Sequence, residues 1–240
     1  MNACALIPIF DHPGAIEKVV TALPPELPCL IVDDGSAEAT RAALRRIGSE
    51  REDAWVVRRD RNGGKGAALK TGYRAALARG FTHVVQLDAD GQHNASDVPR
   101  FLAVMRAQPD ALVLGVPEFD ASAPLARIYA RQLSRGLVWL ACLSRVVPDP
   151  LCGFRGVPLA PALAVIDAAQ TGDWMDFEPE MAVRMVWHGA PIATLPTRVI
   201  YPPDGISHFS FARDYPRLAS LYVRLVGGML WRAPGLWSRT

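Results

Sequence analysis

VVQLDADGQH, residues 84–93, joins an apolar run of strand-forming residues to two aspartates in a glycine-containing turn. Alternation along an extended chain places Asp88 and Asp90 on one side, where both carboxylates can bind one hard divalent cation. Water and the oxygens of a diphosphate would supply the other ligands. A calcium EF-hand loop is excluded, because its twelfth position would be Pro99 instead of a bidentate glutamate. The stretch therefore predicts a metal site that holds a nucleotide diphosphate.

Short strand-like runs alternate with helical patterns on both sides of this stretch. The expected strands are residues 3–10, 29–32, 55–58, 83–87 and 111–115. The expected helices are residues 14–23, 37–47, 65–79, 96–107, 124–147 and 174–188, with a helical tail from residue 207. This alternation is typical of an α/β, Rossmann-like and mostly parallel sheet covered by helices, in which ligands bind beyond the carboxyl ends of the strands.

Composition restricts the class of protein. A chain of 240 residues with 50% hydrophobic residues can bury a substantial core. A net charge of +2 does not indicate nucleic-acid binding. The four cysteines form no CxxC pair, which favours a reducing cytoplasm over a zinc site or a disulfide framework. The N-terminus has no signal-peptide pattern, and no apolar run reaches the roughly 18–20 residues that a membrane span needs.

The segment IVDDGS, residues 31–36, ends the second expected strand with two carboxylates. Asp33 and Asp34 could accept hydrogen bonds from a nucleotide base or a ribose. An Asx turn that begins the next helix explains the same residues equally well. The segment by itself leaves both interpretations open.

The run RNGGKGAALKTG, residues 61–72, follows the third expected strand and opens a helix. Its glycines allow the backbone to approach a ligand, and Lys65 adds positive charge beside a helix N-terminus. A Walker loop is excluded, since Arg59 stands where that loop needs glycine and Gly66 where it needs serine or threonine. The run predicts a nucleotide-contacting loop, with an ordinary flexible turn as the alternative.

Residues 173–189, DWMDFEPEMAVRMVWHG, place two glutamates near the start of a helix. Glu178 and Glu180 could simply stabilise the positive end of the helix dipole. A catalytic base at the edge of the sheet would occupy the same position.

Taken in order, IPIF, IVDDGS, NGGKGAAL, LDADGQH, LCGFRG and FEPEMAVRMVWHG resemble family 2 glycosyltransferases of the polyprenyl-phosphate sugar synthase type. The resemblance covers most of the chain, from about residue 5 to about residue 210, and implies the GT-A fold. It implies nucleotide-sugar contacts by Pro8, Asp33, Asp34, Lys65, Asp88, Ala89 and Arg131. It also implies binding of Mg or Mn by Asp88, Asp90 and Gln92.

The resemblance further implies the catalytic groups. Glu178 takes the position of the base, because Met181, Arg184 and Gly189 keep the spacing that follows the carboxylate in the family. Asp149 resembles the acidic residue before the family's GFR turn. The segment YPPDGISHF, residues 201–209, resembles the family's RxxGxS segment near the donor phosphates, although the family's basic first residue is replaced by Tyr201 or Pro202.

These motifs predict an inverting, metal-dependent hexosyltransferase that uses a UDP- or GDP-sugar and a lipid-linked acceptor, either polyprenyl phosphate or a glycolipid hydroxyl. Two alternatives remain. A sugar nucleotidyltransferase would release pyrophosphate, and a non-catalytic nucleotide-sugar-binding protein would bind the donor without transfer or hydrolysis.

Two arginine-striped segments predict contact with a membrane surface. Arg127, Arg131 and Arg135 recur every four residues in the first, and the tail places Leu218, Leu221, Tyr222, Leu225 and Met229 opposite Arg213, Arg217 and Arg224. Packing on the core or on a second subunit, as in a homodimer, is the alternative. We expect a glycosyltransferase domain of residues 1–205, divided into a donor half of 1–116 and an acceptor half of 117–205. An amphipathic tail of residues 206–240 would hold the protein at the cytoplasmic membrane face.

Overall fold

The computed structural model of the protein describes residues 1–119, 125–199 and 211–237. The described strands are β1 Ala3–Ile9, β2 Cys29–Asp33, β3 Ala54–Arg58, β4 His83–Gln86, β5 Leu112–Phe119, β6 Arg155–Pro158 and β7 Ile192–Val199. The described α-helices are α1 Pro13–Thr21, α2 Glu38–Glu50, α3 Lys65–Ala78, α4 Val98–Ala107, α5 Leu125–Cys142, α6 Leu159–Ala168, α7 Phe177–His188 and α8 Phe211–Trp237. A short 3-10 turn, Ala95–Asp97, precedes α4.

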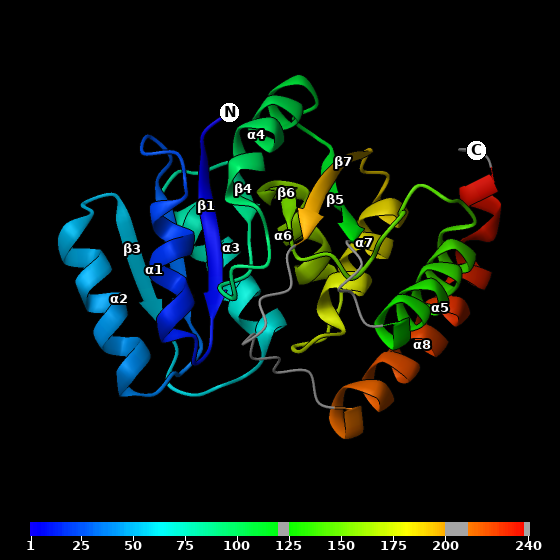
Figure 1. Ribbon diagram of the computed structural model, residues 1–240. Helices are drawn as coiled ribbons and strands as arrows, with labels where there is room; N and C mark the ends of the chain where they lie inside the picture. Colours follow the sequence, from blue (N-terminus) through cyan, green and yellow to red (C-terminus); the bar gives the residue numbers. More distant parts are fainter. Residues whose placement is uncertain (120–124, 200–210, 238–240) are drawn as a thin grey trace.

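These strands form one sheet in the order β3-β2-β1-β4-β6-β5-β7. The pairs β1 with β2, β2 with β3, β1 with β4 and β5 with β7 are parallel, whereas β6 runs antiparallel to both β4 and β5. The sequence-based prediction of a mostly parallel α/β sheet is therefore confirmed. The carboxyl ends of β1, β2 and β4 lie at one edge of the sheet, where the chain turns into the motif loops (Figure 1).

Alternation along β1 divides the core between the two faces of the sheet. Cys4 and Leu6 join the cluster that includes residues of α3, α6 and α7, whereas Ala5, Ile7 and Ile9 join the cluster that includes residues of α1, α2 and α4. All of these side chains are buried. A strand that is covered on both faces has a continuous apolar sequence, and β1 follows this pattern.

The five strands expected from the sequence are present, with boundaries that differ by at most four residues. Three elements of the second half, β6, α6 and β7, were not predicted. The strand β6 has four residues, and α6 follows it without a loop, so neither leaves a distinct periodic pattern. The place of β6 in the sheet depends on its pairing with β4 and β5, which are distant in the sequence.

The two arginine-striped segments form α5 and α8, which pack side by side away from the β3 edge of the sheet (Figure 1). The apolar side predicted for the tail is buried in the protein, with Leu218, Leu221, Tyr222, Leu225 and Met229 all at most 8% exposed. Among the described residues, no helix is long and apolar enough to cross a membrane. The expected division at residue 116 falls inside β5, and the one at residue 205 lies outside the described residues.

Candidate active site

A cavity of about 1120 Å³ opens where the motif loops meet α5, α7 and α8. Most of the predicted site residues line it. They are Pro8, Asp34, Lys65, Asp88, Ala89, Asp90, Gln92, Arg131 and Glu178. Asp33 and Asp149 do not line it.

Close packing of α3 on α7 brings Lys65 and Glu178 together. Gly66 in the first turn of α3 is buried, and a Cβ atom there would collide with the Cβ atom of Phe177 and lie 2.9 Å from the carbonyl carbon of Asp173. The backbone nitrogen of Ala67 also donates to the Asp173 carbonyl oxygen at 2.9 Å. The close approach that this glycine allows is therefore to the protein's own 172–177 segment.

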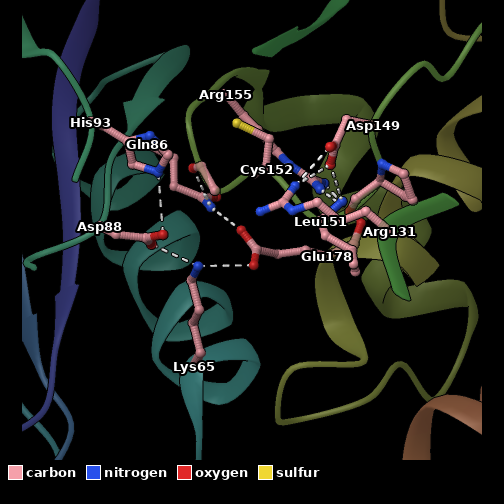
Figure 2. A network of polar contacts seen from close by, with 12 residues as sticks. Lys65, Gln86, Asp88, His93, Arg131, Asp149, Leu151, Cys152, Arg155 and Glu178 are labelled. Atoms are coloured by element: carbon pink, nitrogen blue, oxygen red, sulfur yellow. Dashed lines mark hydrogen bonds and ion pairs between the residues drawn. The ribbon is translucent and has the colours of Figure 1, made fainter. Parts of the chain in front are cut away.

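Lys65 lies between two carboxylates at the base of the cavity (Figure 2). Its Nζ atom is 2.6 Å from Asp88 Oδ1 and 2.8 Å from Glu178 Oε2. Burial disfavours the ammonium ion, but Asp88 and Glu178 outweigh burial and raise the pKa of Lys65 above its ordinary value. Lys65 is therefore a fixed cation at the point where the sheet edge meets α7.

Both oxygens of the Asp88 carboxylate have a partner. Lys65 binds Oδ1, and His93 Nε2 lies 3.3 Å from Oδ2. Burial opposes its ionisation, but Lys65 and His93 together hold the pKa of Asp88 far below its ordinary value. Gly153 makes room for this carboxylate, because a Cβ atom at that position would collide with Asp88 Oδ2. The GFR turn thus packs directly against the first aspartate of LDADGQH.

Asp88 and Asp90 leave the end of the sheet in a turn, because β4 ends at Gln86. Strand alternation therefore does not place them, contrary to the sequence-based argument. Asp90 Oδ1 instead accepts a hydrogen bond from the backbone nitrogen of Gln92 at 3.0 Å, and Asp90 and Gln92 both line the cavity. Burial, and next the charge of Asp88, raise the pKa of Asp90.

This arrangement fits a divalent cation. Burial raises the pKa of Asp90 most and the neighbouring charge of Asp88 raises it next, and a bound cation would relieve the repulsion between the two carboxylates. Carboxylate and amide oxygens are the donor set that Mg²⁺ and Mn²⁺ prefer. No group of three His, Cys, Asp or Glu side chains among the described residues could hold a metal. Oxygens of a bound diphosphate would have to complete the ligand set.

The two aspartates of IVDDGS have different roles in the fold. Asp33 accepts from the Ser36 backbone nitrogen at 2.8 Å and pairs with Arg58, so it stabilises the turn after β2 without capping α2, which begins at Glu38. Asp34 lines the cavity and accepts from the Gly64 backbone nitrogen at 2.8 Å. Burial raises the pKa of Asp34, against the lowering effects of Gly63, Gly64 and Arg59. Asp34 therefore braces the glycine loop at the cavity wall.

The carboxylate of Asp149 lies behind the cavity wall, held by Arg131 of α5. Arg131 Nη1 is 2.8 Å from Oδ1 and 2.7 Å from Oδ2, and the backbone nitrogen of Leu151 donates to Oδ1 at 2.8 Å. The pair ties α5 to the turn before β6 (Figure 2). Of the two, Arg131 is the one that lines the cavity.

Glu178 and Glu180 point to different sides of α7, since successive helical residues are about 100° apart. Glu180 is fully buried and binds Arg184, with Nε at 2.8 Å, and the backbone nitrogen of Gly172. Glu178 faces the cavity and Lys65. Glu180 therefore has the structural role, in which it stabilises the start of the helix and pairs inside the protein. Glu178 is the glutamate that can reach a ligand.

Gln86 and Arg155 belong to the same polar network but were not predicted (Figure 2). Gln86 Nε2 donates to Glu178 Oε1 at 2.8 Å, and Arg155 Nη1 donates to the Glu178 backbone carbonyl at 2.8 Å. Gln86 lies in the apolar run of β4. A polar residue in a strand that is covered on both faces is the sequence signal that could have identified it as a site residue. Arg155 belongs to LCGFRG and also donates to the nearby carbonyls of Cys152 and Pro150, so only its contact with Glu178 joins distant parts of the sequence.

The glycosyl transferase family 2 model matches residues 4–140. An undecaprenyl-phosphate mannosyltransferase of Micrococcus luteus is 31% identical over 119 residues, and that match spans 48% of each chain. Glucosyl-3-phosphoglycerate synthase of Mycobacterium tuberculosis has a similar fold, with a TM-score of 0.66 and 18% identity over 96% of this chain and 79% of that one. A mannosyltransferase of Pyrobaculum calidifontis, in complex with GDP-Man and Mn²⁺, has a TM-score of 0.59 and 18% identity over 85% of this chain and 58% of that one.

The fold is therefore that of the GT-A glycosyltransferases, as the sequence motifs predicted. The chain belongs to glycosyl transferase family 2 and is a glycosyltransferase with a nucleotide-sugar donor.

Proposed function

We propose that the protein transfers a hexose from a UDP- or GDP-sugar to a lipid-linked acceptor, with inversion at the anomeric carbon and with Mg²⁺ or Mn²⁺ as cofactor. One observation carries this proposal. A single cavity joins the charged groups at the sheet edge to an apolar surface between α5 and α8.

The charged part of the cavity suits a nucleoside diphosphate sugar. Asp34 and the glycine loop form one wall, and Asp88, Asp90 and Gln92 lie beside them. A cation bound by Asp88, Asp90 and Gln92 would offset the negative charge of the leaving diphosphate. Lys65 adds a positive charge next to Asp88, so the chain itself also offsets part of the negative charge of the diphosphate.

The apolar part of the cavity suits a lipid chain. Its apolar lining is contributed by α5 and α8 and consists of Ala130, Leu133, Leu137, Leu140, Leu218, Ala219, Val223 and Val226. The polar side chains that α5 and α8 add to the lining are Arg131, Ser134, Arg213, Tyr215 and Tyr222. A lipid phosphate or hydroxyl could bind these groups while its chain follows the apolar surface. The name of the Micrococcus luteus relative, an undecaprenyl-phosphate mannosyltransferase, supports a lipid phosphate.

Glu178 lines the cavity from the first turn of α7, and it has one of two roles. It removes the proton from a hydroxyl acceptor, or it orders the site for a phosphate acceptor, which is already an anion. In the structure its Oε2 is paired with Lys65 and its Oε1 accepts from Gln86. This restraint favours the ordering role and a phosphate acceptor.

The direct test is transfer. The purified chain is incubated with radiolabelled UDP- or GDP-hexoses, Mn²⁺ and polyprenyl phosphate, and label is measured in the organic phase. With either the UDP- or the GDP-sugar as donor, but not both, we expect a labelled lipid-extractable product and release of the corresponding nucleoside diphosphate. Pyrophosphate release would contradict the proposal in favour of nucleotidyl transfer, and donor binding without any transfer would contradict it in favour of a binding protein.

A matched pair of variants tests the apolar surface. Val223 lines the cavity and is 74% exposed, and Leu230 does not line it and is 68% exposed. The two are seven residues apart and lie on similar sides of α8. Val223→Glu should lower transfer to the lipid at least ten-fold without changing donor affinity, and Leu230→Glu should leave transfer to detergent-dispersed lipid unchanged.

Equal losses in both variants would contradict the lipid-chain assignment and favour a general contact of α8 with a membrane. That contact is part of our proposal for the natural setting, because Leu230 and Trp231 are strongly exposed beside Arg232. Sedimentation with anionic vesicles measures it separately. Leu230→Glu should weaken sedimentation even where it leaves transfer unchanged.

The Glu178→Gln variant separates the two acceptor classes. With a hydroxyl acceptor, loss of the base should lower kcat by a factor of roughly 10²–10⁴. With a phosphate acceptor the loss should be below about ten-fold. Donor affinity, measured by the thermal shift with Mn²⁺ and nucleotide, should stay the same in both cases. A Gln variant with native kcat on an identified hydroxyl acceptor would exclude Glu178 as the base.

A further inference from the structure

Gln86 is the last residue of β4 and is fully buried. Its amide oxygen accepts from the Tyr73 hydroxyl at 2.7 Å. Its amide nitrogen donates to the Gly153 carbonyl at 3.0 Å and to Glu178 Oε1 at 2.8 Å. The amide therefore uses its oxygen and both hydrogens within the protein.

These partners leave the Gln86 amide a single favourable orientation. If the amide were rotated by 180°, its oxygen would face the Gly153 carbonyl and the Glu178 carboxylate, both of which are acceptors. Its NH₂ group would then face the Tyr73 hydroxyl, which can accept as well as donate, so the two acceptors are what disfavour the rotated amide. The Gly153 carbonyl only accepts and therefore fixes the orientation independently of Glu178, while Tyr73, which is 3% exposed and extends from α3, donates to the amide oxygen. The amide is thus a fixed donor aimed at Glu178.

Gln86 does not line the cavity, whereas Glu178 does. Gln86 holds Oε1 of Glu178 while Lys65 holds Oε2 (Figure 2). The other charged groups around this carboxylate are Arg155, which donates to the Glu178 backbone carbonyl, and Asp88, which lies beyond Lys65. A carboxylate restrained on both oxygens has its orientation set before any ligand arrives.

We propose that Gln86, oriented by the Gly153 carbonyl and bound by the Tyr73 hydroxyl, is a positioning residue that sets the direction of the Glu178 carboxylate at the transfer site. This inference rests on the proposed function, because it assigns to Glu178 a part in the reaction. Gln86 acts through Glu178 and not through contact with donor or acceptor.

A double-mutant cycle tests this dependence. Gln86→Met keeps the shape of the side chain and removes its polar groups. With Glu178 present, this change should lower kcat roughly ten-fold and leave donor affinity unchanged, since small misplacements of a reacting group are costly. In the Glu178→Ala background the same change should lower kcat less than two-fold. Equal losses in both backgrounds would overturn the proposal.

Two further variants separate positioning from loss of stability. Tyr73→Phe removes only the hydroxyl that donates to the Gln86 amide oxygen, so the amide is held less firmly and kcat should fall by a smaller factor in the same direction. Thr197→Val is the matched control, because it removes one buried side-chain hydrogen bond, from Thr197 Oγ1 to Asp97 Oδ2 at 2.8 Å, outside the cavity lining. Its kcat should equal that of the wild type. A loss as large as that of Gln86→Met would overturn the proposal.

A stability cycle measures the contact without any substrate. The decreases in Tm of Gln86→Met and Glu178→Ala should not add in the double variant, because both remove the same hydrogen bond. Additive decreases would overturn the positioning role. Absence of transfer by the wild-type chain would instead contradict the proposed function, so the two failures are distinguishable.

Discussion

At the scale of single residues, the candidate site is a set of charges whose balance depends on one lysine. Lys65 pairs with both Asp88 and Glu178 but offsets only one of their two negative charges, and burial and the charge of Asp88 raise the pKa of Asp90. A cation bound at Asp88 and Asp90 together with a diphosphate would therefore relieve a charge that the chain leaves unbalanced. The electrostatics at this scale link metal binding to donor binding.

The Asp90→Ala variant tests this link. It removes a carboxylate from the proposed metal ligands, so Mn²⁺ should no longer strengthen nucleotide binding. Wild-type protein should show a larger thermal shift with UDP or GDP plus Mn²⁺ than with nucleotide alone, and the variant should show the same shift in both cases. Addition of EDTA to the wild type should reproduce the behaviour of the variant.

Asp110→Asn is a suitable control, because Asp110 is exposed and lies outside the cavity lining. It should keep the Mn²⁺-dependent shift. Unchanged Mn²⁺ dependence in Asp90→Ala would remove Asp90 from the proposed ligand set.

At the scale of elements, contact between α3 and α7 builds the site from two distant parts of the sequence. Lys65 begins α3, and Glu178 lies in the first turn of α7. The C-terminus of α7 is closed by Gly189 at φ 88°, where the backbone nitrogen of Ala190 donates to the Met185 carbonyl. The position of Glu178 relative to Lys65 depends on how closely α3 and α7 approach each other.

Gly66→Ala should force α3 and α7 apart, because the added methyl group would collide with Phe177. Overpacking of this kind costs roughly 1–3 kcal/mol, and urea unfolding should measure that loss. The variant should also bind donor more weakly, since Lys65 would be displaced from Glu178.

Gly48→Ala in α2 provides the opposite control. No atom lies within 4 Å of a Cβ atom at Gly48, so the change should stabilise the protein by about 0.5–1 kcal/mol through helix propensity. Destabilisation of both variants by the same amount would contradict the packing argument for Gly66.

At the scale of the whole molecule, the four cysteines report on the integrity of the core. Cys4, Cys29, Cys142 and Cys152 are all free and buried, and burial raises the pKa of each thiol to about 12. Only the thiolate reacts readily. We therefore expect no reaction of the native protein with Ellman's reagent at pH 8, and reaction of four thiols after unfolding in urea.

The same pKa values predict a loss of stability in alkali. Above the pKa of an unfolded thiol, about 8.5, the unfolded state releases protons that the folded state keeps, so the free energy of unfolding falls as pH rises. The urea midpoint should decrease between pH 8 and pH 10.5. A constant midpoint, or rapid labelling of one thiol in the native protein, would contradict the burial of these groups.

Much of the fold could be predicted from local patterns. The five strands recognised in the sequence are apolar runs bounded by polar turns, and the motif loops follow them directly. The helical character of α5 and α8 and the apolar side of α8 also follow from local periodicity, although α5 ends at Cys142, five residues before the expected end. The candidate site could be predicted in part for the same reason, since Lys65, Asp88, Asp90 and Glu178 each stand in a distinctive motif.

Other features were decided by the tertiary structure alone. The strand β6 pairs with β4 and β5, Arg131 holds Asp149 behind the cavity wall, and Gln86 contacts Glu178. Each of these contacts joins residues far apart in the chain. The turn role of Asp33 also depends on such a contact, its pairing with Arg58. The sequence by itself determined which residues carry charge and which segments are extended or helical. Only packing decided which charges meet, because contact energies depend on distances that no local pattern encodes.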